Sequence, residues 1–281
     1  MQALILTGLD ASVIVCDNMW QCACCGQTAL LDQVQNFMIC PKCGSILATK
    51  ETPMKHQYLK EVCSANDYEL VIDACAGSGV VQFSNGQLKE GSPLILEKMM
   101  KDKGRCICID VNPKTHKLLK RFCKHAEVLH GDCNKILPRL IDGKCPALIY
   151  IDPFGYGVPV IDQKMVLKMA RTPNTDLLIH FSWRISREMG FARKYLTSDD
   201  STLKKRARGY AKSLNIWWGS IEWVKWGSMR KKDYAEKYAS PLRENNTVEI
   251  TAFGGRGVSF YLIFATKFQT PEYGIQKWMN K

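Results

Sequence analysis

Five short apolar segments constrain the fold of this 281-residue chain more than any other feature of its sequence. They are rich in β-branched and aromatic residues, and helix-compatible stretches such as KTHKLLKRFCKH separate them. The segments lie at residues 68–80, 104–113, 126–137, 147–155 and 175–184. Strands that alternate with helices predict an α/β fold with a doubly wound, mostly parallel sheet.

Four of the five predicted strands end in an acidic residue. The four acids are Asp73, Asp110, Asp132 and Asp152. Ligands of such sheets bind beyond the carboxyl ends of the strands, where these acids are expected to gather. A single acid at this place is more often the N-cap of the next helix, but four at four strand ends predict a binding site.

A glycine loop follows the first of these strands, in the stretch YELVIDACAGSGV. Gly77 and Gly79 would let a nucleotide-like ligand approach the backbone closely, although a glycine turn after a strand is often only a turn. Asp110, at the end of the second strand, suits the paired hydroxyl groups of a ribose. About thirty residues separate Gly79 from Asp110, where about twenty are usual, so VQFSNGQLKEGSPL is expected to loop out.

Two cysteine pairs near the N-terminus predict a structural zinc site. Cys22 and Cys25 form the first C-x2-C pair, Cys40 and Cys43 form the second after fourteen residues, and a glycine follows each pair. Two such knuckles complete a tetrahedron of thiolates and leave no open position for water. The alternative is a set of buried or redox-active cysteines, and Cys24 is ambiguous because it lies between two predicted ligands.

The domain organisation follows from this zinc site. We expect a zinc-ribbon module at residues 1–50 and a main domain at residues 54–281, with a charged linker at residues 48–63 between the cysteines and the first strand. A segment this small depends on its metal to fold, whereas the long second part can bury a core of its own.

Composition indicates the partners and the compartment. The net charge of +12 makes an acidic partner plausible, and nucleic acid is the commonest one. Thirteen cysteines are an odd number spread over a long chain, which favours a reducing compartment over a disulfide framework. The opening segment lacks a positive region, and no apolar run is long enough for a membrane span, so we expect a cytosolic protein without a membrane partner.

A basic and aromatic stretch between the fifth strand and the C-terminal segments predicts contact with nucleic acid. Its cations are Lys204, Lys205, Arg206, Arg208 and Lys212. Tyr210 lies among them, and Trp217 and Trp218 follow. Cations neutralise phosphates and aromatic rings stack on bases, but a run of charge is often only a solvated helix face, and the tryptophans could be core residues.

The order of these motifs resembles that of the class I S-adenosylmethionine-dependent methyltransferases. The series VIDACAGSG, EGSPLILEKM, ICID, HGDCN, YIDPFG and FYLIFATKF is similar to the three-Cys-motif partner family across residues 55–270. Two β-rich runs around GGRG predict an antiparallel pair that closes the sheet. The resemblance implies a Rossmann-like sheet of seven strands with S-adenosylmethionine as cofactor. It also hints at a protein partner, which the sequence does not identify.

The same resemblance assigns the cofactor residues. Asp73, Ala76, Gly77 and Gly79 would line the loop and the methionine side of the cofactor. Asp110 would hold the ribose hydroxyl groups, and Asp132 would lie near the adenine.

The tetrapeptide DPFG at residues 152–155 is similar to motif IV of the amino-methyltransferases, and closer to the form found in tRNA guanine-N2 methyltransferases. Hydrogen bonds from an exocyclic amine to Asp152 and to the carbonyl of Pro153 would orient this poor nucleophile for attack on a methyl group. Phe154 would stack on an extruded base. The plain alternative is an Asp-Pro turn with a buried phenylalanine.

These observations favour an S-adenosylmethionine-dependent N-methyltransferase that acts on a nucleobase amine in RNA or DNA, with RNA favoured. The zinc ribbon would help to dock the substrate or only stabilise the fold. Two alternatives stay open: a methyltransferase for small molecules or proteins, and a catalytically silent partner protein that binds nucleic acid. The sequence leaves the modified base, the oligomeric state and any protein partner unidentified.

Overall fold

The computed structural model of the protein confirms the α/β fold, with a sheet of seven strands in the order β11-β12-β10-β9-β4-β7-β8. It describes residues 19–30, 40–49, 51–83, 85–153, 161–182, 184–254 and 258–267. The chain divides into two compact units, Met1–Asp132 and Cys133–Lys281, and each is described by itself. The division expected from the sequence, at residues 50–54, stays a prediction.

The strand order is that of a doubly wound sheet extended by a hairpin. Numbered along the chain, the strands of the large sheet begin 3-2-1-4-5, as in the dinucleotide-binding order, and an antiparallel pair then takes the place of a sixth parallel strand. This is the Rossmann-like arrangement that the resemblance to methyltransferases implies.

The first unit contributes three parallel strands to this sheet: β4 (Leu70–Asp73), β7 (Arg105–Asp110) and β8 (Glu127–His130). Every residue of β4 is buried. A strand covered on both faces needs apolar side chains at successive positions, which explains why the run has no polar alternation. The acid that ends β4 and the acid that ends β7 are therefore fixed at the edge of a packed core.

Among the described residues of the first unit, the helices are α2 (Thr52–Ala65), α3 (Ser92–Met100) and α4 (Pro113–Phe122). Each carries a proline in its first turn, where a missing N–H costs nothing. Most of the predicted linker at residues 48–63 is thus helix α2, because Pro53 starts a helix here instead of interrupting one.

The predicted loop between Gly79 and α3 is a β-hairpin. Strands β5 (Val80–Gln82) and β6 (Leu88–Glu90) pair antiparallel, and β3 (Ile46–Leu47) pairs parallel with β5. The result is a separate three-stranded sheet, β3-β5-β6. This insertion accounts for the long spacing between Gly79 and Asp110.

The second unit contains β9 (Ala147–Ile151) parallel to β10 (Thr175–Ser182), and the antiparallel pair β11 (Thr247–Phe253) and β12 (Phe260–Thr266). β12 also pairs antiparallel with β10, so the predicted closing hairpin is confirmed. The helices of this unit are α5 (Cys133–Leu140), α6 (Gln163–Arg171), α7 (Arg184–Tyr195), α8 (Ser201–Trp217), α9 (Lys231–Ala239) and the 3-10 turns η1 (Glu222–Lys225) and η2 (Ser240–Glu244).

An aromatic cluster anchors the C-terminal end of α8. Trp217 and Trp218 are buried, and the Trp217 ring stacks on that of Tyr238 with centroids 4.7 Å apart. Phe181 of β10 contacts both tryptophans and Tyr238. The interpretation of these tryptophans as core residues is therefore confirmed, and they are not available to stack on bases.

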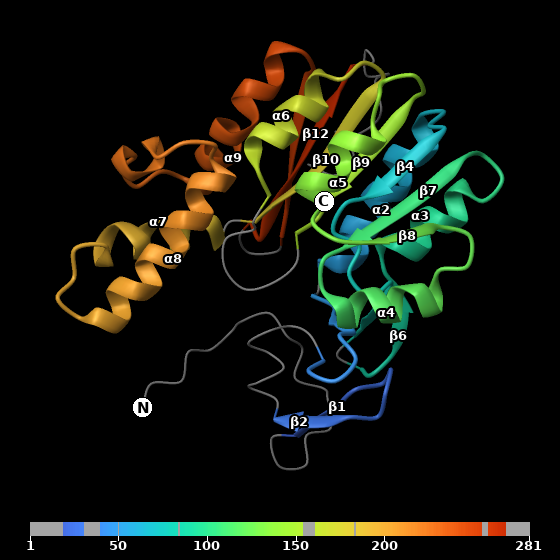
Figure 1. The fold of residues 1–281 in the computed structure, drawn as a ribbon, viewed down its shortest axis with the longest axis horizontal. Helices are drawn as coiled ribbons and strands as arrows, with labels where there is room; N and C mark the ends of the chain where they lie inside the picture. The colour runs from blue at the N-terminus through green and yellow to red at the C-terminus, as the bar shows by residue number, and fades with distance from the viewer. Residues whose placement is uncertain are drawn as a thin grey trace. The chain divides into compact units, whose positions relative to one another are not determined.

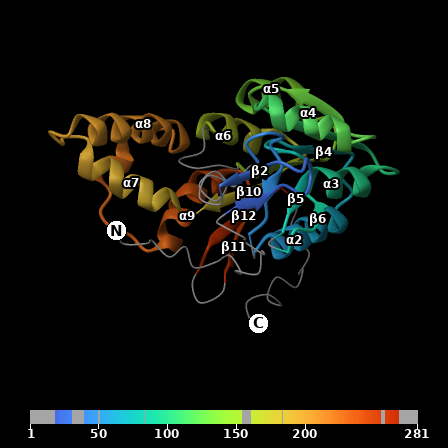
Figure 2. The ribbon, with the colours of Figure 1, turned by 90° about the horizontal axis from the view of Figure 1, so that it is seen from below.

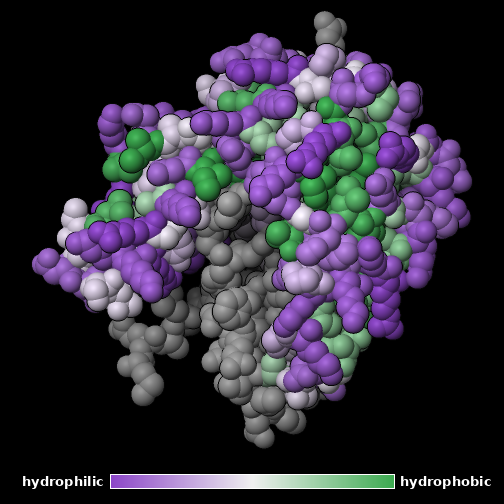
Figure 3. Space-filling model, viewed as in Figure 1, coloured by the Kyte–Doolittle hydropathy of each residue, from purple (hydrophilic) through white to green (hydrophobic). Residues whose placement is uncertain are grey.

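Helices α7 and α8 lie side by side in both ribbon views (Figures 1 and 2). Their visible surface consists mainly of hydrophilic side chains (Figure 3). Among the helices that the structure describes, none has both the length and the apolar character that a membrane span requires.

The buried carboxylate of Glu97 on α3 provides a test of the packing of the first unit. Its Oε1 accepts the backbone N–H groups of Lys124 at 2.6 Å and Ala126 at 2.8 Å, together with that of His125 between them. We expect Glu97→Ala to lower the free energy of unfolding by about 2 kcal/mol, because three donors lose their acceptor. Urea unfolding followed by circular dichroism measures this change.

Glu61→Ala is the matched control, because Glu61 is exposed and the hydrogen bond that it accepts from Gln57 lies at the surface. We expect a change of less than about 0.5 kcal/mol for this variant. Equal effects of the two substitutions would show that Glu97 does not hold the turn after α4.

Candidate active site and metal centre

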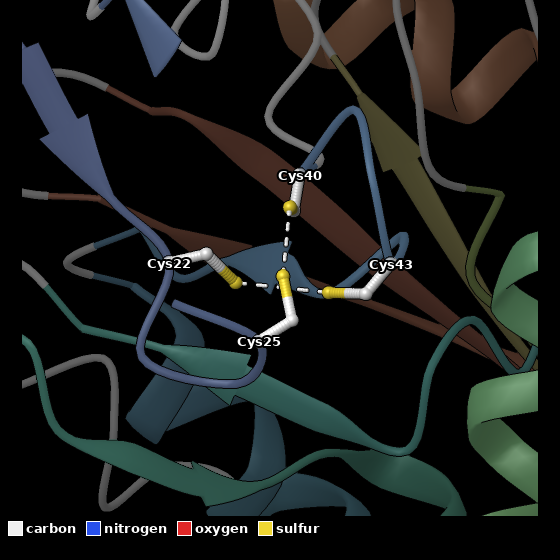
Figure 4. Close-up of side chains that lie close together, drawn as sticks. All are labelled: Cys22, Cys25, Cys40 and Cys43. Carbon is white, nitrogen blue, oxygen red and sulfur yellow. Dashed lines mark hydrogen bonds between the residues drawn. The ribbon is translucent and has the colours of Figure 1, made fainter. Parts of the chain in front are cut away.

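The four predicted zinc ligands lie together in the structure. Their sulfur atoms are all within 4.8 Å of one another, with Cys22 to Cys43 at 3.6 Å and Cys25 to Cys40 at 3.8 Å. A tetrahedral zinc site with bonds of about 2.3 Å places its sulfur atoms roughly 3.8 Å apart, so these residues fit the metal. Figure 4 shows the four side chains converging from two turns of the chain.

The two turns that carry the ligands have the same backbone geometry. The N–H of Gly26 donates to the carbonyl of Cys22 at 2.8 Å, and the N–H of Gly44 donates to that of Cys40 at 2.9 Å. Both glycines have a positive φ, of 70° and 79°, which side chains rarely tolerate. The glycine after each pair is therefore required by the turn, as the sequence predicts.

The electrostatics of the cluster favour a bound cation. Burial raises the pKa of Cys40 to about 12. Burial also acts to raise the pKa of Cys43, but contacts with the side chain and backbone of Ser45 outweigh it and lower the pKa to about 7. Burial also raises the pKa of Cys25. Thiolates at Cys25, Cys40 and Cys43 therefore form together more readily when a positive charge lies among them.

Cys24 is close to the cluster but is not one of the four converging thiols. Burial and the nearby Cys43 thiol raise its pKa to about 12, against the smaller effect of Arg121. The structure therefore favours Cys22 and Cys25 as the ligands of the first pair.

The glycine loop packs against the end of β7. Gly77 and Gly79 have positive φ values of 63° and 77°, so only glycine fits the loop without strain. The N–H of Ala76 donates to the carbonyl of Ile109 at 2.9 Å, and the N–H of Gly77 donates to Asp110 Oδ2 at 2.8 Å. Two predicted cofactor elements, 33 residues apart in sequence, are thus in direct contact.

Asp110 is held from several sides. Its Oδ1 accepts the N–H of Asn112 at 2.8 Å and the hydroxyl of Thr115, and its carbonyl accepts the N–H of Gly131 at 3.1 Å. The residue is half-buried, and the next side chain, Val111, is 67% exposed. A fixed carboxylate beside an exposed apolar side chain fits a nucleoside, because one accepts hydroxyl groups and the other packs on a ring.

Asp73 and Asp132 occupy the two neighbouring strand ends. Asp73 is fully buried at the end of β4, and its Oδ1 accepts the N–H of Cys75 at 3.3 Å. Asp132 is half-buried and follows Gly131, two residues after β8. The first unit therefore brings all six predicted cofactor residues to the carboxyl ends of three strands, although the burial of Asp73 gives it contact with the loop and not with solvent.

Asp152 lies directly after β9 in the second unit. The hydroxyl of Tyr150 donates to its Oδ2 at 3.0 Å, and Nδ1 of His180 is 3.2 Å from its Oδ1. Pro153 follows and is half-buried, whereas Phe154 lies outside the described residues. The carboxylate thus accepts a hydrogen bond at one oxygen and has the His180 ring beside the other, and a protonated His180 would form an ion pair with it.

Sequence reasoning missed His180 and Tyr150. His180 lies on β10, and its ring centroid is 4.7 Å from that of Phe260 on β12. The available indication was a histidine in the middle of the apolar run LLIHFS, where a polar side chain needs a partner. Thr115 and Ser45 were missed as well, because nothing local to them predicts their contacts with Asp110 and the cysteines.

The predicted nucleic-acid-binding cations all lie on α8. Lys205, Arg206, Arg208 and Lys212 are exposed, and Lys204 is half-buried. The guanidinium of Arg206 is 4.9 Å from the ring centroid of Phe191 on α7 and donates to the hydroxyl of Tyr210 at 3.0 Å. Arg206 therefore has a structural role between the two helices, while the other exposed cations remain available to solvent.

Comparison with known proteins finds similarity only among solved structures. No family model matches the sequence, and no curated protein matches it. A methyltransferase from Geobacter sulfurreducens is 13% identical, covers 78% of this chain and 80% of its own, and has a TM-score of 0.42. A SAM dependent methyltransferase from Aquifex aeolicus is 14% identical, covers 75% of this chain and 88% of its own, and has a TM-score of 0.40. The plantazolicin methyltransferase BamL is 9% identical, covers 78% of this chain and 87% of its own, and has a TM-score of 0.43.

These TM-scores are below 0.5, so the fold assignment depends on the strand order of this chain itself. The predicted three-Cys-motif partner family is not established by the comparisons.

The ligand set of the metal centre can be tested directly. We expect the purified protein to hold one zinc ion per chain, measured by plasma mass spectrometry after dialysis. Cys40→Ser should lose the ion, because three thiolates and a hydroxyl bind zinc far more weakly. Cys24→Ser should keep it, since the Cys24 thiol lies outside the set of four.

Loss of zinc from Cys24→Ser, with retention in Cys22→Ser, would show that the first knuckle uses Cys24. Cys145→Ser, at a half-buried thiol of the second unit, controls for removal of a cysteine elsewhere.

Proposed function

We propose that the protein is an S-adenosylmethionine-dependent methyltransferase that methylates an exocyclic amine of a nucleobase in nucleic acid, with RNA favoured. The observation that carries the proposal is the position of Asp110 and Asp152, each at the carboxyl end of a strand in a sheet of methyltransferase order. In open α/β sheets this is where ligands bind.

The first unit would hold the cofactor. Asp110 would accept hydrogen bonds from the ribose hydroxyl groups, and Val111 would pack against the adenine. The glycine loop gives the chain close approach to a ligand, and Asp132 would lie near the base. When bound, S-adenosylmethionine supplies a methyl group on a positively charged sulfur, which is an electrophile for an amine.

The second unit would orient the substrate amine. Asp152 and the carbonyl of Pro153 would accept hydrogen bonds from its N–H groups and direct the nitrogen lone pair along one line. Tyr150 donates to the carboxylate and His180 lies beside it, so little reorganisation would be needed as positive charge develops on the nitrogen. The amine proton can leave after methyl transfer, and Phe154 would stack on the flipped base.

Helix α8 would bind the phosphate backbone of the substrate. Its exposed cations Lys205, Arg208 and Lys212 are three and four residues apart, which places them on one face of the helix, and no acidic residue lies between residues 201 and 217. Phosphate neutralisation needs exposed cations of this kind, and the overall charge of +12 supports long-range attraction of an anionic polymer. Base stacking by Trp217 and Trp218 forms no part of the proposal, because both side chains are core.

The remaining elements of the proposal concern zinc, compartment and partners. The four-cysteine centre would bind a structural Zn²⁺, since four protein ligands leave no position for substrate. We place the protein in the cytosol, where thiolate ligands stay reduced. A protein partner is compatible with the proposal and is not needed for the chemistry.

Cofactor binding tests the first part of the proposal. We expect zinc-loaded protein to bind S-adenosylhomocysteine with a dissociation constant on the order of micromolar in calorimetric titration. Asp110→Ala should weaken binding about tenfold or more, since a charged acceptor of hydroxyl groups is lost. Asp142→Ala, at an exposed acid in a loop, should bind as the unmodified protein does.

Binding of neither S-adenosylmethionine nor S-adenosylhomocysteine would remove the methyltransferase proposal. The protein would then be a zinc-stabilised binding protein.

Methyl transfer tests the second part. With tritiated S-adenosylmethionine and total RNA or DNA, we expect incorporation that falls at least about a hundredfold in Asp152→Ala, while cofactor affinity is kept. Incorporation into neither nucleic acid, with cofactor binding intact, would favour a small molecule or a protein as substrate.

The role of α8 predicts a change in salt dependence. We expect the combined variant Lys205→Ala, Arg208→Ala and Lys212→Ala to bind RNA more weakly, and the slope of log affinity against log salt to fall by roughly two to three. A matched variant, Lys101→Ala with Lys103→Ala, removes exposed lysines from the turn that follows α3. An unchanged slope in the α8 variant would show that this helix does not contact phosphate.

A further inference from the structure

The chain segment that follows the second cysteine pair forms a strand beside the glycine loop of the first unit. Strand β3, which begins three residues after Cys43, pairs with β5, and β5 directly follows Gly79. The N–H of Ala48 donates to the carbonyl of Gln82 at 2.8 Å. The chain segment that binds the metal is therefore a strand partner of the segment that completes the loop.

The side chain of Gln82 joins the first knuckle to β5. Its Oε1 accepts the N–H of Ala23 at 2.9 Å, and its Nε2 donates to the carbonyl of Gln21 at 3.0 Å. Gln82 is buried, with 4% of its surface exposed. A buried amide that makes both bonds to one turn fixes that turn, because losing either partner leaves a polar group unsatisfied.

Ile46 contacts the glycine loop itself. A β-carbon built on Gly77 would collide with Cδ1 of Ile46, so the two residues are in close contact. The Gly77 N–H donates to Asp110. The strand that follows the second knuckle thus covers the loop residue that reaches the candidate ribose acceptor.

The second knuckle also rests on the start of α4. A β-carbon on Gly44 would lie 3.0 Å from Cγ2 and 3.1 Å from the backbone nitrogen of Thr115. The Thr115 hydroxyl donates to Asp110, and Nζ of Lys114 donates to the carbonyl of Pro41 at 2.8 Å. Two segments donate hydrogen bonds to Asp110: the glycine loop at Gly77 and the start of α4 at Thr115. Both are therefore in contact with the segment around the second cysteine pair.

We propose that the four-cysteine centre is a positioning device for the cofactor site, so that metal binding and cofactor binding are thermodynamically linked. Ile46 and Gln82 are the positioning residues that connect the two. The proposal rests on the proposed function for the identity of the ligand, S-adenosylmethionine. It differs from a zinc module that only stabilises itself or only docks substrate, because neither of these requires the metal for cofactor affinity.

Linkage is reciprocal, which gives two independent measurements on the full chain. Metal-free protein, prepared with a chelator under reducing conditions, should bind S-adenosylhomocysteine about tenfold or more weakly than zinc-loaded protein. Saturating S-adenosylhomocysteine should slow zinc loss to a chromophoric chelator and raise zinc affinity by the same factor. Equal affinities in both comparisons would overturn the proposal.

A zinc-loaded variant separates linkage from loss of folding. We expect Ile46→Ala to keep one zinc ion per chain and to bind S-adenosylhomocysteine about fivefold more weakly, because the loop loses its cover. Ile221→Ala makes the same substitution at a side chain that is 63% exposed in the second unit, and it should change neither property. Unaltered binding by Ile46→Ala would overturn the role of this contact.

Hydrogen exchange without any cofactor distinguishes failure of this proposal from failure of the proposed function. Removal of zinc should speed amide exchange in residues 73–82 and leave β9 and β10 protected. Should the zinc-loaded protein bind no cofactor while this faster exchange is seen, the function is wrong and the structural coupling holds. Unchanged exchange in residues 73–82 would overturn the coupling itself.

Discussion

The hydrogen bond from the Gly77 N–H to the Asp110 carboxylate is the contact on which the first unit's candidate site depends. It joins the loop after β4 to the end of β7, and the neighbouring bond from Ala76 to Ile109 repeats the connection through the backbone. A hydrogen bond to an ionised acceptor is roughly twice as strong as a hydrogen bond between two neutral groups. These bonds therefore stabilise one loop conformation, with Gly77 and Gly79 at positive φ, among the many that two glycines allow.

The Asp110 carboxylate accepts hydrogen bonds from several donors within the protein, which limits the number that it can accept from a ligand. Asp110 already accepts the N–H of Asn112 and the hydroxyl of Thr115 at its other oxygen. A carboxylate has about four lone-pair sites, so at least one is left for a ribose hydroxyl. The internal bonds fix the direction in which that remaining site points, so that a ligand meets an acceptor that is already oriented.

The sequence was sufficient to predict the features that depend on local chemistry. The strand positions followed from continuous apolar runs. The set of four converging cysteines followed from their spacing, because two C-x2-C pairs that are each followed by a glycine are typical of metal-binding turns. The start of α2 was missed because a charged stretch around Pro53 reads equally well as a linker, and only the burial of Tyr58 and Leu59 decides for a helix.

Contacts between distant segments were beyond sequence reasoning. Nothing in the residues around Gln82 indicates that its amide would bind the turn of Cys22, 60 residues earlier, since any surface glutamine has the same local pattern. Trp217 and Trp218, at the C-terminal end of α8, show the reverse case. Their basic neighbours in the sequence suggest a binding face, but Phe181 and Tyr238 from other elements pack against both rings. Whether an aromatic residue meets solvent is decided by tertiary packing, which a single sequence does not display.

The Tyr150–Asp152–His180 arrangement illustrates why a strand end suits a charged group better than a strand interior. Within β9 an acid would be desolvated on both faces, at a cost of several kcal/mol by the order of magnitude for buried ions. One residue beyond the strand, Asp152 keeps 12% of its side-chain surface exposed and gains two polar neighbours. His180 keeps 17% of its side-chain surface exposed, and its Nδ1 lies 3.2 Å from Oδ1 of the carboxylate. An acid placed in this way is held in one orientation at the edge of the core, which is what the alignment of a neutral amine requires.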